Sequence, residues 1–360
     1  MTMPLVQLHG HESLRAQLIA AIARGALPAS ILFHGPRGVG KQRLALWLGQ
    51  VLLCTGHEPK PCEKCPQCRF TLQLAHPDLQ WVFPRPRLKD SDPSLEDVRE
   101  DYAEATAERV AAQGLYAPPS GTDGLYVATV RAVVRAAALS PAMAARKVFI
   151  IGDAERMVSQ VGSEEAANAF LKLLEEPPAD TTVILTSSEP GALLPTIRSR
   201  VIAVRVNALP DRVVREFVAD PLVKEYLRSE SPKASMEELI HAAGGAPGRV
   251  LSGTILKDAT LQAQRLLDAA TSTDRGARYR AAFGQGAARA RGSFTDSLNA
   301  LEVLLHDRVR TATQSGNYDL ATGAAKALEL VERAKEQAAG NVSPQLLTAG
   351  LLRDMADLMK

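Results

Sequence analysis

The sequence predicts an α/β domain built on a parallel sheet, followed by two regions that are entirely helical. Short apolar runs with the length of buried strands alternate with helical segments over the first 206 residues, which is typical of a parallel sheet covered on both faces. The first such strand leads directly into a glycine-rich loop. Beyond residue 207 the strand-like runs stop and only helical patterns follow.

Composition limits the kinds of protein that this chain can be. A length of 360 residues suits two or three domains, and 46% hydrophobic residues are enough to form their cores. The net charge of +2 and the aromatic content of 4% argue against a protein that holds nucleic acid mainly by overall charge or by stacking. No signal peptide or membrane-spanning run is recognisable, so we expect a cytoplasmic protein with reduced thiols.

The first elements in chain order are predicted to be a helix over residues 11–25, a strand over 30–34 and a helix over 43–53. Aliphatic side chains recur at helical spacing in the first segment, which Gly25 ends. The segment SILFH is short and largely apolar, as expected for a buried strand. A strand, a glycine loop and a helix in this order are the setting that a phosphate-binding loop requires.

The loop GPRGVGKQ differs from the phosphate-binding pattern G-x-x-x-x-G-K-[ST] only at its last position. In that pattern the backbone amides and the lysine hold the phosphates, and a Ser or Thr hydroxyl helps to hold Mg²⁺. Gln42 stands where that hydroxyl belongs, whereas Gly35, Gly40 and Lys41 fit the pattern. The loop therefore either still binds a nucleotide or serves only as architecture.

A second Mg²⁺ ligand is also missing from its expected place. Such loops pair with an Asp at the end of a neighbouring strand, but the apolar run over residues 147–151 is followed by Gly152, and Asp153 comes one position late. A late Asp could still reach the metal through a water molecule. Two losses at one ion nevertheless predict that Mg²⁺ binding and ATP hydrolysis are gone, and they leave ATP binding open. The candidate residues of this degenerate nucleotide site are Gly35, Gly38, Gly40, Lys41, Gln42 and Asp153.

All four cysteines lie close together in the sequence, in a run that contains two C-x₂-C spacings. Such tight turns direct their sulfurs at one point, and four thiolates complete a tetrahedral Zn²⁺ site. An iron–sulfur cluster and a disulfide pair are the alternatives, of which the second is disfavoured in a reducing compartment. Zinc in this site would be structural, because no coordination position stays open. The predicted ligands are Cys54, Cys62, Cys65 and Cys68.

The later segments continue the alternation and then become helical. Residues 84–124 contain prolines, glycines and an acidic run, and we expect an insertion with one exposed helix. Further helices are predicted over residues 127–139 and 164–174, and further strands over 147–151, 182–187 and 201–206. Short helices around the glycine turn GGAPG are predicted over residues 209–251, and an Ala- and Leu-rich helical region over 256–360.

Two stretches connect the chain to a known family. NAFLKLLEEPP (168–178) and LLPTIRSR (193–200) resemble the clamp-loader branch of the AAA+ proteins, and the order of the motifs along the chain is also similar. The resemblance implies an AAA+ P-loop domain (1–206) with a zinc module (54–68) and an insertion (84–124), a small helical lid (207–254), and an all-α C-terminal collar domain (255–360).

Within this family the chain most resembles the δ′-type subunits of bacterial DNA polymerase III, through HPDLQWV, GDAERM and GGAPGRVL. The resemblance implies a stator that does not hydrolyse ATP and that helps to load the sliding clamp on primed DNA during replication. Such a subunit is part of a DNA-directed DNA polymerase holoenzyme, a nucleotidyltransferase. The implied partners are the γ/τ and δ subunits, the sliding clamp and, through the assembly, primed DNA.

The resemblance also implies roles for single residues. Gly152 falls on the Mg²⁺ aspartate of the family, Asp153 on the catalytic acid, and Gly248 on the lid arginine that senses phosphate. Arg200 ends the family's Ser-Arg motif, which implies an arginine finger that reaches the ATP of a neighbouring subunit. A surface salt bridge is the simpler interpretation of Arg200.

Two other functions stay open. The chain would be an active γ/τ-like ATPase if Gln42 were tolerated and Asp153 held the metal. It would be a zinc-dependent DNA-binding protein if the cysteine module bound DNA by itself. Few positive charges support this function, because Lys60, Lys64 and Arg69 are the only cations close to the cysteines of residues 62–68.

Overall fold

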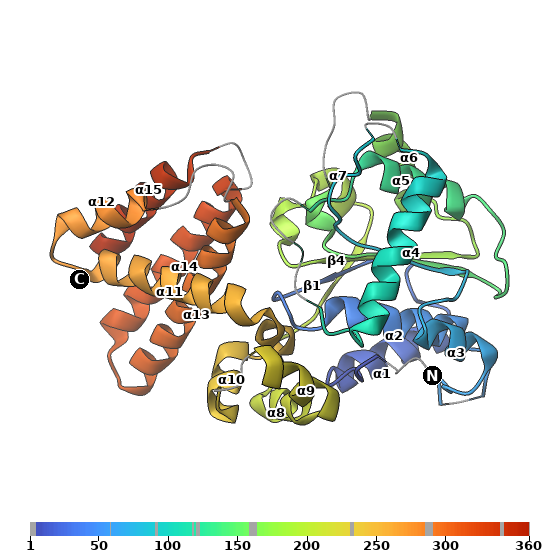
Figure 1. Ribbon diagram of the computed structural model, residues 1–360, viewed down its shortest axis with the longest axis horizontal. Coiled ribbons are helices and arrows are strands. Elements are labelled where there is room, and N and C mark those ends of the chain that lie inside the picture. The colour runs from blue at the N-terminus through green and yellow to red at the C-terminus, as the bar shows by residue number, and fades with distance from the viewer. Residues whose placement is uncertain are drawn as a thin grey trace. The chain divides into compact units, whose positions relative to one another are not determined.

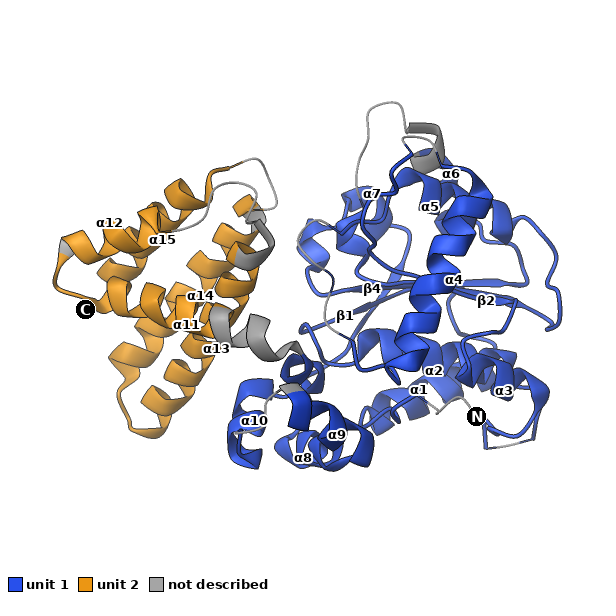
Figure 2. Ribbon diagram, viewed as in Figure 1, with its two compact units in different colours: residues 1–119, 123–251 blue, residues 120–122, 252–360 orange. Residues whose placement is uncertain are grey.

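The computed structural model describes residues 5–57, 59–90, 93–116, 119, 123–157, 164–230, 234–284, 291–338 and 342–359. The chain forms two compact units, one of residues 1–119 and 123–251 and the other of residues 120–122 and 252–360 (Figure 2). All the described strands belong to the first unit, and the described elements of the second unit are helices.

The core of the first unit is a five-stranded parallel sheet with the strand order β2-β3-β4-β1-β5 (Figure 1). Four strands confirm the sequence predictions to within one residue at each end. The strand β2 was not predicted, because LQWV is very short and contains a polar residue. The strands are β1 (Ser30–His34), β2 (Leu79–Val82), β3 (Lys147–Ile151), β4 (Thr181–Ser187) and β5 (Ile202–Arg205).

Helices cover both faces of this sheet, as the alternation of elements predicted. Successive side chains of a strand point to opposite faces. Ile31 and Phe33 of β1 accordingly share one core with the helices α1 and α2, whereas Leu32 shares another with α5 and α6. The helix α3 was not predicted, because it is short and begins within the cysteine run. The helices that flank the sheet are α1 (Glu12–Ala23), α2 (Lys41–Leu53), α3 (Pro66–Leu72), α5 (Val127–Ala137), α6 (Glu164–Glu175) and α7 (Pro195–Arg198).

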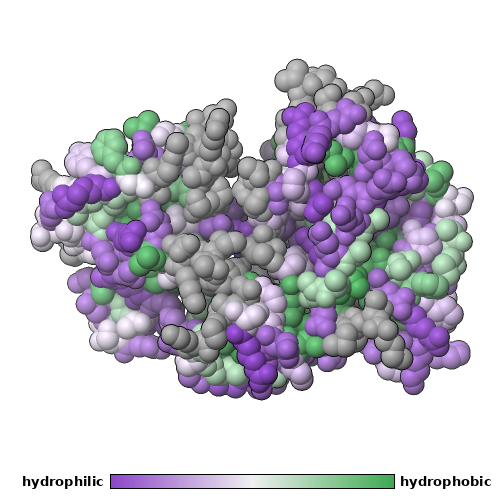
Figure 3. All heavy atoms as spheres, viewed as in Figure 1, coloured by the Kyte–Doolittle hydropathy of each residue, from purple (hydrophilic) through white to green (hydrophobic). Residues whose placement is uncertain are grey.

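The insertion between β2 and β3 carries the helix α4 (Leu95–Ala111). The expectation that this helix is exposed is wrong for one of its sides. Ala105 is buried, Tyr102 donates a hydrogen bond to the carbonyl oxygen of Phe83 at 2.7 Å, and the Arg109 guanidinium lies 3.2 Å from the centre of the Phe83 ring. The buried side combines Val98 and Ala105 with Tyr102 and Arg109, and so few apolar residues do not mark a core face in the sequence. The outer side is hydrophilic (Figure 3).

Short helices follow the sheet, as predicted, and share a small apolar core that includes Val214 and Ile240. Gly244 and Gly245, which follow α10, both have a positive φ, so the glycine turn needs these residues. The elements are α8 (Asp211–Ala219), α9 (Pro221–Glu230), α10 (Met236–Ala243) and the 3₁₀ helix η3 (Pro247–Ser252).

The second unit is helical in its described part, in agreement with the pattern predicted from residue 256. Its core consists mainly of alanine and leucine, with Leu298, Leu301 and Met355 fully buried. The helices are α11 (Gly253–Thr271), α12 (Arg275–Phe283), α13 (Arg291–Gln314), α14 (Tyr318–Ala338) and α15 (Pro344–Leu358). Among the described residues of both units, no helix has the length and apolar character needed to cross a membrane.

Candidate functional site

The glycine loop is closed around Lys41, the first residue of α2, whose side chain is buried. Lys41 Nζ donates to the carbonyl oxygens of Gly35 and Pro36 and to Ser188 Oγ, each at 2.9 Å. An ammonium group has three N–H donors, so all of them are used inside the protein. Burial lowers the pKa of Lys41 to about 8, although two nearby carboxylates oppose this shift.

Gln42 fills the place that the sequence pattern assigns to a metal-binding hydroxyl. Its Nε2 donates to Asp153 Oδ2 at 3.0 Å, and its Oε1 accepts from Trp81 Nε1 at 3.0 Å. Gly152 leaves the room for this side chain, because a Cβ at that residue would lie 2.6 Å from Gln42 Oε1. The carboxylate that could have held Mg²⁺ through water is therefore bonded to an amide.

Asp153 and Glu155, which follow β3, form a second cluster of polar contacts near the glycine loop. The backbone N–H of Asp153 donates to Thr186 Oγ1 at 3.1 Å. Glu155 Oε1 accepts from the backbone N–H of Ser188 at 2.9 Å, while its buried Oε2 has no partner among the described residues. Burial and the charge of Asp153 raise the pKa of Glu155 to about 7. The sequence analysis did not identify Glu155, because no local pattern marks it.

The helical region after the sheet is fixed directly to the glycine loop. The backbone N–H of Gly248 donates to the carbonyl oxygen of Gly38 at 2.8 Å. A Cβ on Gly38 would lie 2.8 Å from Arg249 N, and a Cβ on Gly248 would lie 2.9 Å from the Gly38 carbonyl oxygen. Both residues must be glycine for the two backbones to approach this closely. The residue that the resemblance places at the phosphate-sensing arginine thus contacts the loop through its backbone.

The four cysteines come together at the end of α2 and the start of α3. Their sulfur atoms lie within 4.8 Å of one another, and no disulfide links them. Backbone N–H groups lower the pKa values of Cys62 and Cys65, which favours their thiolates, whereas burial raises the pKa of Cys68. Tetrahedral zinc with Zn–S distances of ~2.3 Å requires a similarly compact set of sulfurs. These cysteines could therefore hold a metal such as zinc.

His76 and Asp78 connect the cysteine module to the sheet. His76 Nε2 lies 2.7 Å from Gln67 Oε1 of α3, and His76 Nδ1 accepts from the backbone N–H of Asp78 at 3.0 Å. The Asp78 carboxylate accepts from the backbone N–H groups of residues 142–144, at 2.6–2.7 Å. The sequence analysis missed this arrangement, because its partners lie far apart in the chain.

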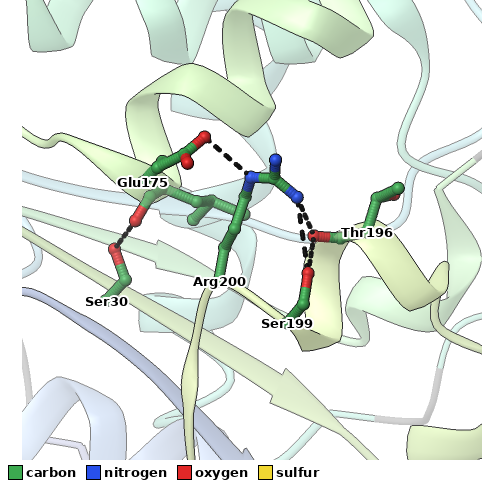
Figure 4. Close-up of polar contacts among 6 residues, drawn as sticks. Ser30, Glu175, Thr196, Ser199 and Arg200 are labelled. Carbon is green, nitrogen blue, oxygen red and sulfur yellow. Dashed lines mark hydrogen bonds and ion pairs between the residues drawn. The ribbon is translucent and has the colours of Figure 1, made fainter.

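Arg200 lies between α7 and β5, at the surface of the first unit. Its Nε donates to Glu175 Oε2 at 3.0 Å, and its Nη1 donates to the Thr196 carbonyl oxygen at 3.0 Å and to Ser199 Oγ at 3.3 Å (Figure 4). The Arg200 side chain is 30% exposed. The salt bridge considered as the simpler interpretation is therefore present, and part of the guanidinium stays accessible.

Comparison with known proteins identifies the family of this chain. The family model described as "DNA polymerase III, delta subunit" matches residues 10–210. The chain belongs to this family. It is a clamp-loader AAA+ protein that resembles the δ′ subunit of DNA polymerase III, and the matched region holds the glycine loop, the cysteines and Arg200.

Individual relatives agree with this family. The chain is 29% identical to DNA polymerase III subunit δ′ of Pseudomonas aeruginosa over 218 residues, which cover 60% of this chain and 52% of that protein. It is 30% identical to the γ/τ subunit of Mycobacterium bovis over 244 residues, which cover 68% of this chain and 35% of that protein. The chain thus spans about half the length of the δ′ relative and about a third of the γ/τ relative.

A DNA polymerase III γ subunit-related protein from Thermotoga maritima matches with a TM-score of 0.41 and 15% identity, over 96% of this chain and all of the other.

Proposed function

We propose that this chain is a δ′-type clamp-loader subunit that does not hydrolyse ATP. In this role it acts in the cytoplasm within the DNA polymerase III holoenzyme, a nucleotidyltransferase, and helps to load the sliding clamp on primed DNA. It offers Arg200 to the ATP of a neighbouring subunit. The observation that carries the proposal is the hydrogen bond from Gln42 to Asp153 at the metal position.

The chemistry of Mg²⁺ explains why this bond matters. Phosphoryl transfer in P-loop proteins needs Mg²⁺ to bridge the phosphate oxygens, and the ion takes oxygen ligands in a strict octahedral arrangement. Here one ligand position is filled by Gln42, whose Oε1 accepts from Trp81 and whose Nε2 donates to Asp153. The other is Gly152, which has no side chain. Asp153, the remaining carboxylate, already accepts a hydrogen bond from Gln42.

The fixed glycine loop supports a stator rather than a motor. A motor subunit moves its lid when nucleotide binds or leaves. In this chain the three bonds of Lys41 hold the glycine loop and Ser188 together, and the bond from Gly248 to Gly38 joins the loop to the lid. Rigid contacts of this kind suit a subunit that closes one end of a ring of related subunits.

Arg200 would be the residue through which the stator promotes ATP hydrolysis by its neighbour. A guanidinium is charged at any physiological pH and can donate two hydrogen bonds to phosphate oxygens. It therefore neutralises negative charge in the transition state when the neighbouring subunit hydrolyses ATP. The partners in this proposal are the γ/τ and δ subunits and, through the assembly, the clamp and primed DNA. Residues 255–360 would join the collar of the assembly.

The cysteine cluster would hold one Zn²⁺ in a structural role. Four protein thiolates saturate a tetrahedral site, so the ion has no position at which to bind a substrate. The cluster joins the end of α2 to the start of α3, and the zinc would fix this connection.

The second candidate is an active γ/τ-like ATPase. The 30% identity to the γ/τ subunit of Mycobacterium bovis favours it, and so do the intact Gly35, Gly40 and Lys41. In this case Asp153 would leave Gln42 and hold the metal.

Nucleotide binding and hydrolysis by the purified chain, with and without Mg²⁺, distinguish the two candidates. We expect no Mg²⁺ effect and no hydrolysis above a Lys41→Ala variant. Mg²⁺-dependent turnover that Lys41→Ala abolishes would overturn the stator proposal. The Gln42→Thr/Gly152→Asp double variant is the matched positive control, because it restores both missing ligand types and should show Mg²⁺-dependent nucleotide binding.

A further inference from the structure

The Arg200 guanidinium is held from two sides, and the two sides come from different elements. The turn after α7 provides two acceptors for Nη1, and Glu175 at the end of α6 provides one for Nε. Figure 4 shows the guanidinium between them, with the other terminal nitrogen bearing no dashed contact. Of the five N–H donors of an arginine, the two on Nη2 are the ones without a partner among the described residues.

Glu175 occupies a position that a helix by itself disfavours. It is the last residue of α6, where the backbone carbonyl groups give the helix end a partial negative charge. A carboxylate is repelled at such an end, and this side chain is 58% exposed, so packing does not explain it. The guanidinium of Arg200 is the cation that the structure pairs with it, at 3.0 Å.

The backbone beneath Glu175 is fixed to the sheet. Ser30 Oγ donates to the carbonyl oxygen of Leu174 at 2.8 Å, and both residues are buried (Figure 4). Ser30 begins β1, the strand that leads into the glycine loop. Pro177 and Pro178 follow and prevent the helix from continuing. A side chain that starts from such a fixed point can hold another group in a defined orientation.

We propose that Glu175 is a positioning residue for Arg200, an inference that rests on the proposed arginine finger. By taking Nε, Glu175 fixes the guanidinium plane from one side while Thr196 and Ser199 fix it from the other. Nη2 is then presented to the phosphates of a nucleotide on the neighbouring subunit, in an orientation that costs little further ordering in the transition state. Glu175 itself need not touch the nucleotide.

The test uses the assembly reconstituted with the ATPase and δ subunits of the same organism. The readouts are kcat and KM for ATP in the presence of clamp and primed DNA. We expect Glu175→Ala to lower kcat by about three- to tenfold with KM unchanged, since one charged hydrogen bond at a partly exposed site is lost. Glu175→Gln should recover part of the loss, because its amide oxygen still accepts from Nε. Glu176→Ala, which removes the adjacent exposed carboxylate, should behave like the parent chain.

A double variant separates positioning from a general structural effect. Glu175→Ala should have no further effect in an Arg200→Ala background, and additional loss there would overturn the inference. Normal turnover with Glu175→Ala, together with low turnover for Arg200→Ala, would overturn the positioning role and leave the finger standing. Normal turnover with Arg200→Ala would instead overturn the finger itself, and the inference with it. Elution of each variant as an intact assembly shows that subunit contacts are preserved.

Discussion

Two polar clusters of the first unit differ in where their hydrogen bonds lead. At Gln42 the donors and acceptors bond to one another, with Asp153 and Trp81 on either side of the amide. At Arg200 the guanidinium is held on two sides but is 30% exposed, and Nη2 has no partner in the described part of the chain. A cluster that satisfies itself stabilises a fold, whereas spare charged donors at a surface are available to another molecule.

The largest test of this comparison is the removal of Arg200. If the exposed cluster acts on a neighbour's ATP, Arg200→Ala should lower hydrolysis by the assembly by about 10³-fold, as the loss of an arginine finger does in other phosphoryl-transfer proteins. Arg200→Lys should recover little, because an ammonium cannot fork between phosphate oxygens. The measurement is steady-state ATP turnover by the reconstituted assembly.

Arg198 is the matched control for Arg200. It lies two residues earlier and is exposed, and its removal lowers the local positive charge by the same amount as the removal of Arg200. Arg198→Ala should change turnover little. Equal losses for both variants would show that net positive charge on this surface matters and that a specific finger does not.

The cysteine cluster is a third case, because its four sulfur atoms need a metal ion as their common partner. Elemental analysis should find one zinc per chain, and Cys68→Ser should abolish zinc binding. Since structural zinc contributes directly to folding, we expect the variant to lose about 3 kcal/mol or more of unfolding free energy. Full stability in Cys68→Ser, measured by denaturant unfolding, would contradict a structural metal.

The two clusters also show what could be predicted from sequence. Gln42 and Gly152 stood out because a local pattern fixes what each position should hold, and the predicted cysteines come together in the structure for the same reason. Trp81 and Glu155 could not be found in this way, because they reach the loop from other elements and only the tertiary fold brings them there.

The secondary structure divides in the same way into elements that a local pattern predicted and elements that it did not. The strand β3 is buried along its whole length, and the apolar run after Lys147 was enough to predict it. The edge strand β2 includes the half-buried Gln80, so its pattern was too weak. The buried side of α4 includes Arg109, whose charge lies against aromatic rings, and a sequence pattern assigns such a residue to solvent.

A smaller effect is expected from breaking the closed cluster. Gln42→Leu leaves the Asp153 carboxylate and the Trp81 indole N–H without their partner, so it should cost about 2 kcal/mol of unfolding free energy. Gln50 on the same helix is the matched control. It is buried, but its Nε2 has no partner among the described residues, so Gln50→Leu should be neutral or slightly stabilising. Equal costs for both variants would show that the Gln42 bonds contribute nothing specific.

The smallest expected effect concerns Glu155 and depends on pH. The folded protein raises the pKa of Glu155 from 4.5 to about 7, so the folded state holds this proton more tightly than the unfolded chain does. Its stabilising contribution is therefore complete below about pH 4.5 and is lost as the pH rises through about 7. Glutamine stays neutral, so Glu155→Gln should change stability little at pH 4.5 and should add about 1–2 kcal/mol at pH 8. Chemical denaturation at the two pH values measures both effects. A loss of stability at pH 8 would mean that the ionised carboxylate is paired, in which case the second cluster near the glycine loop is closed as completely as the one at Gln42.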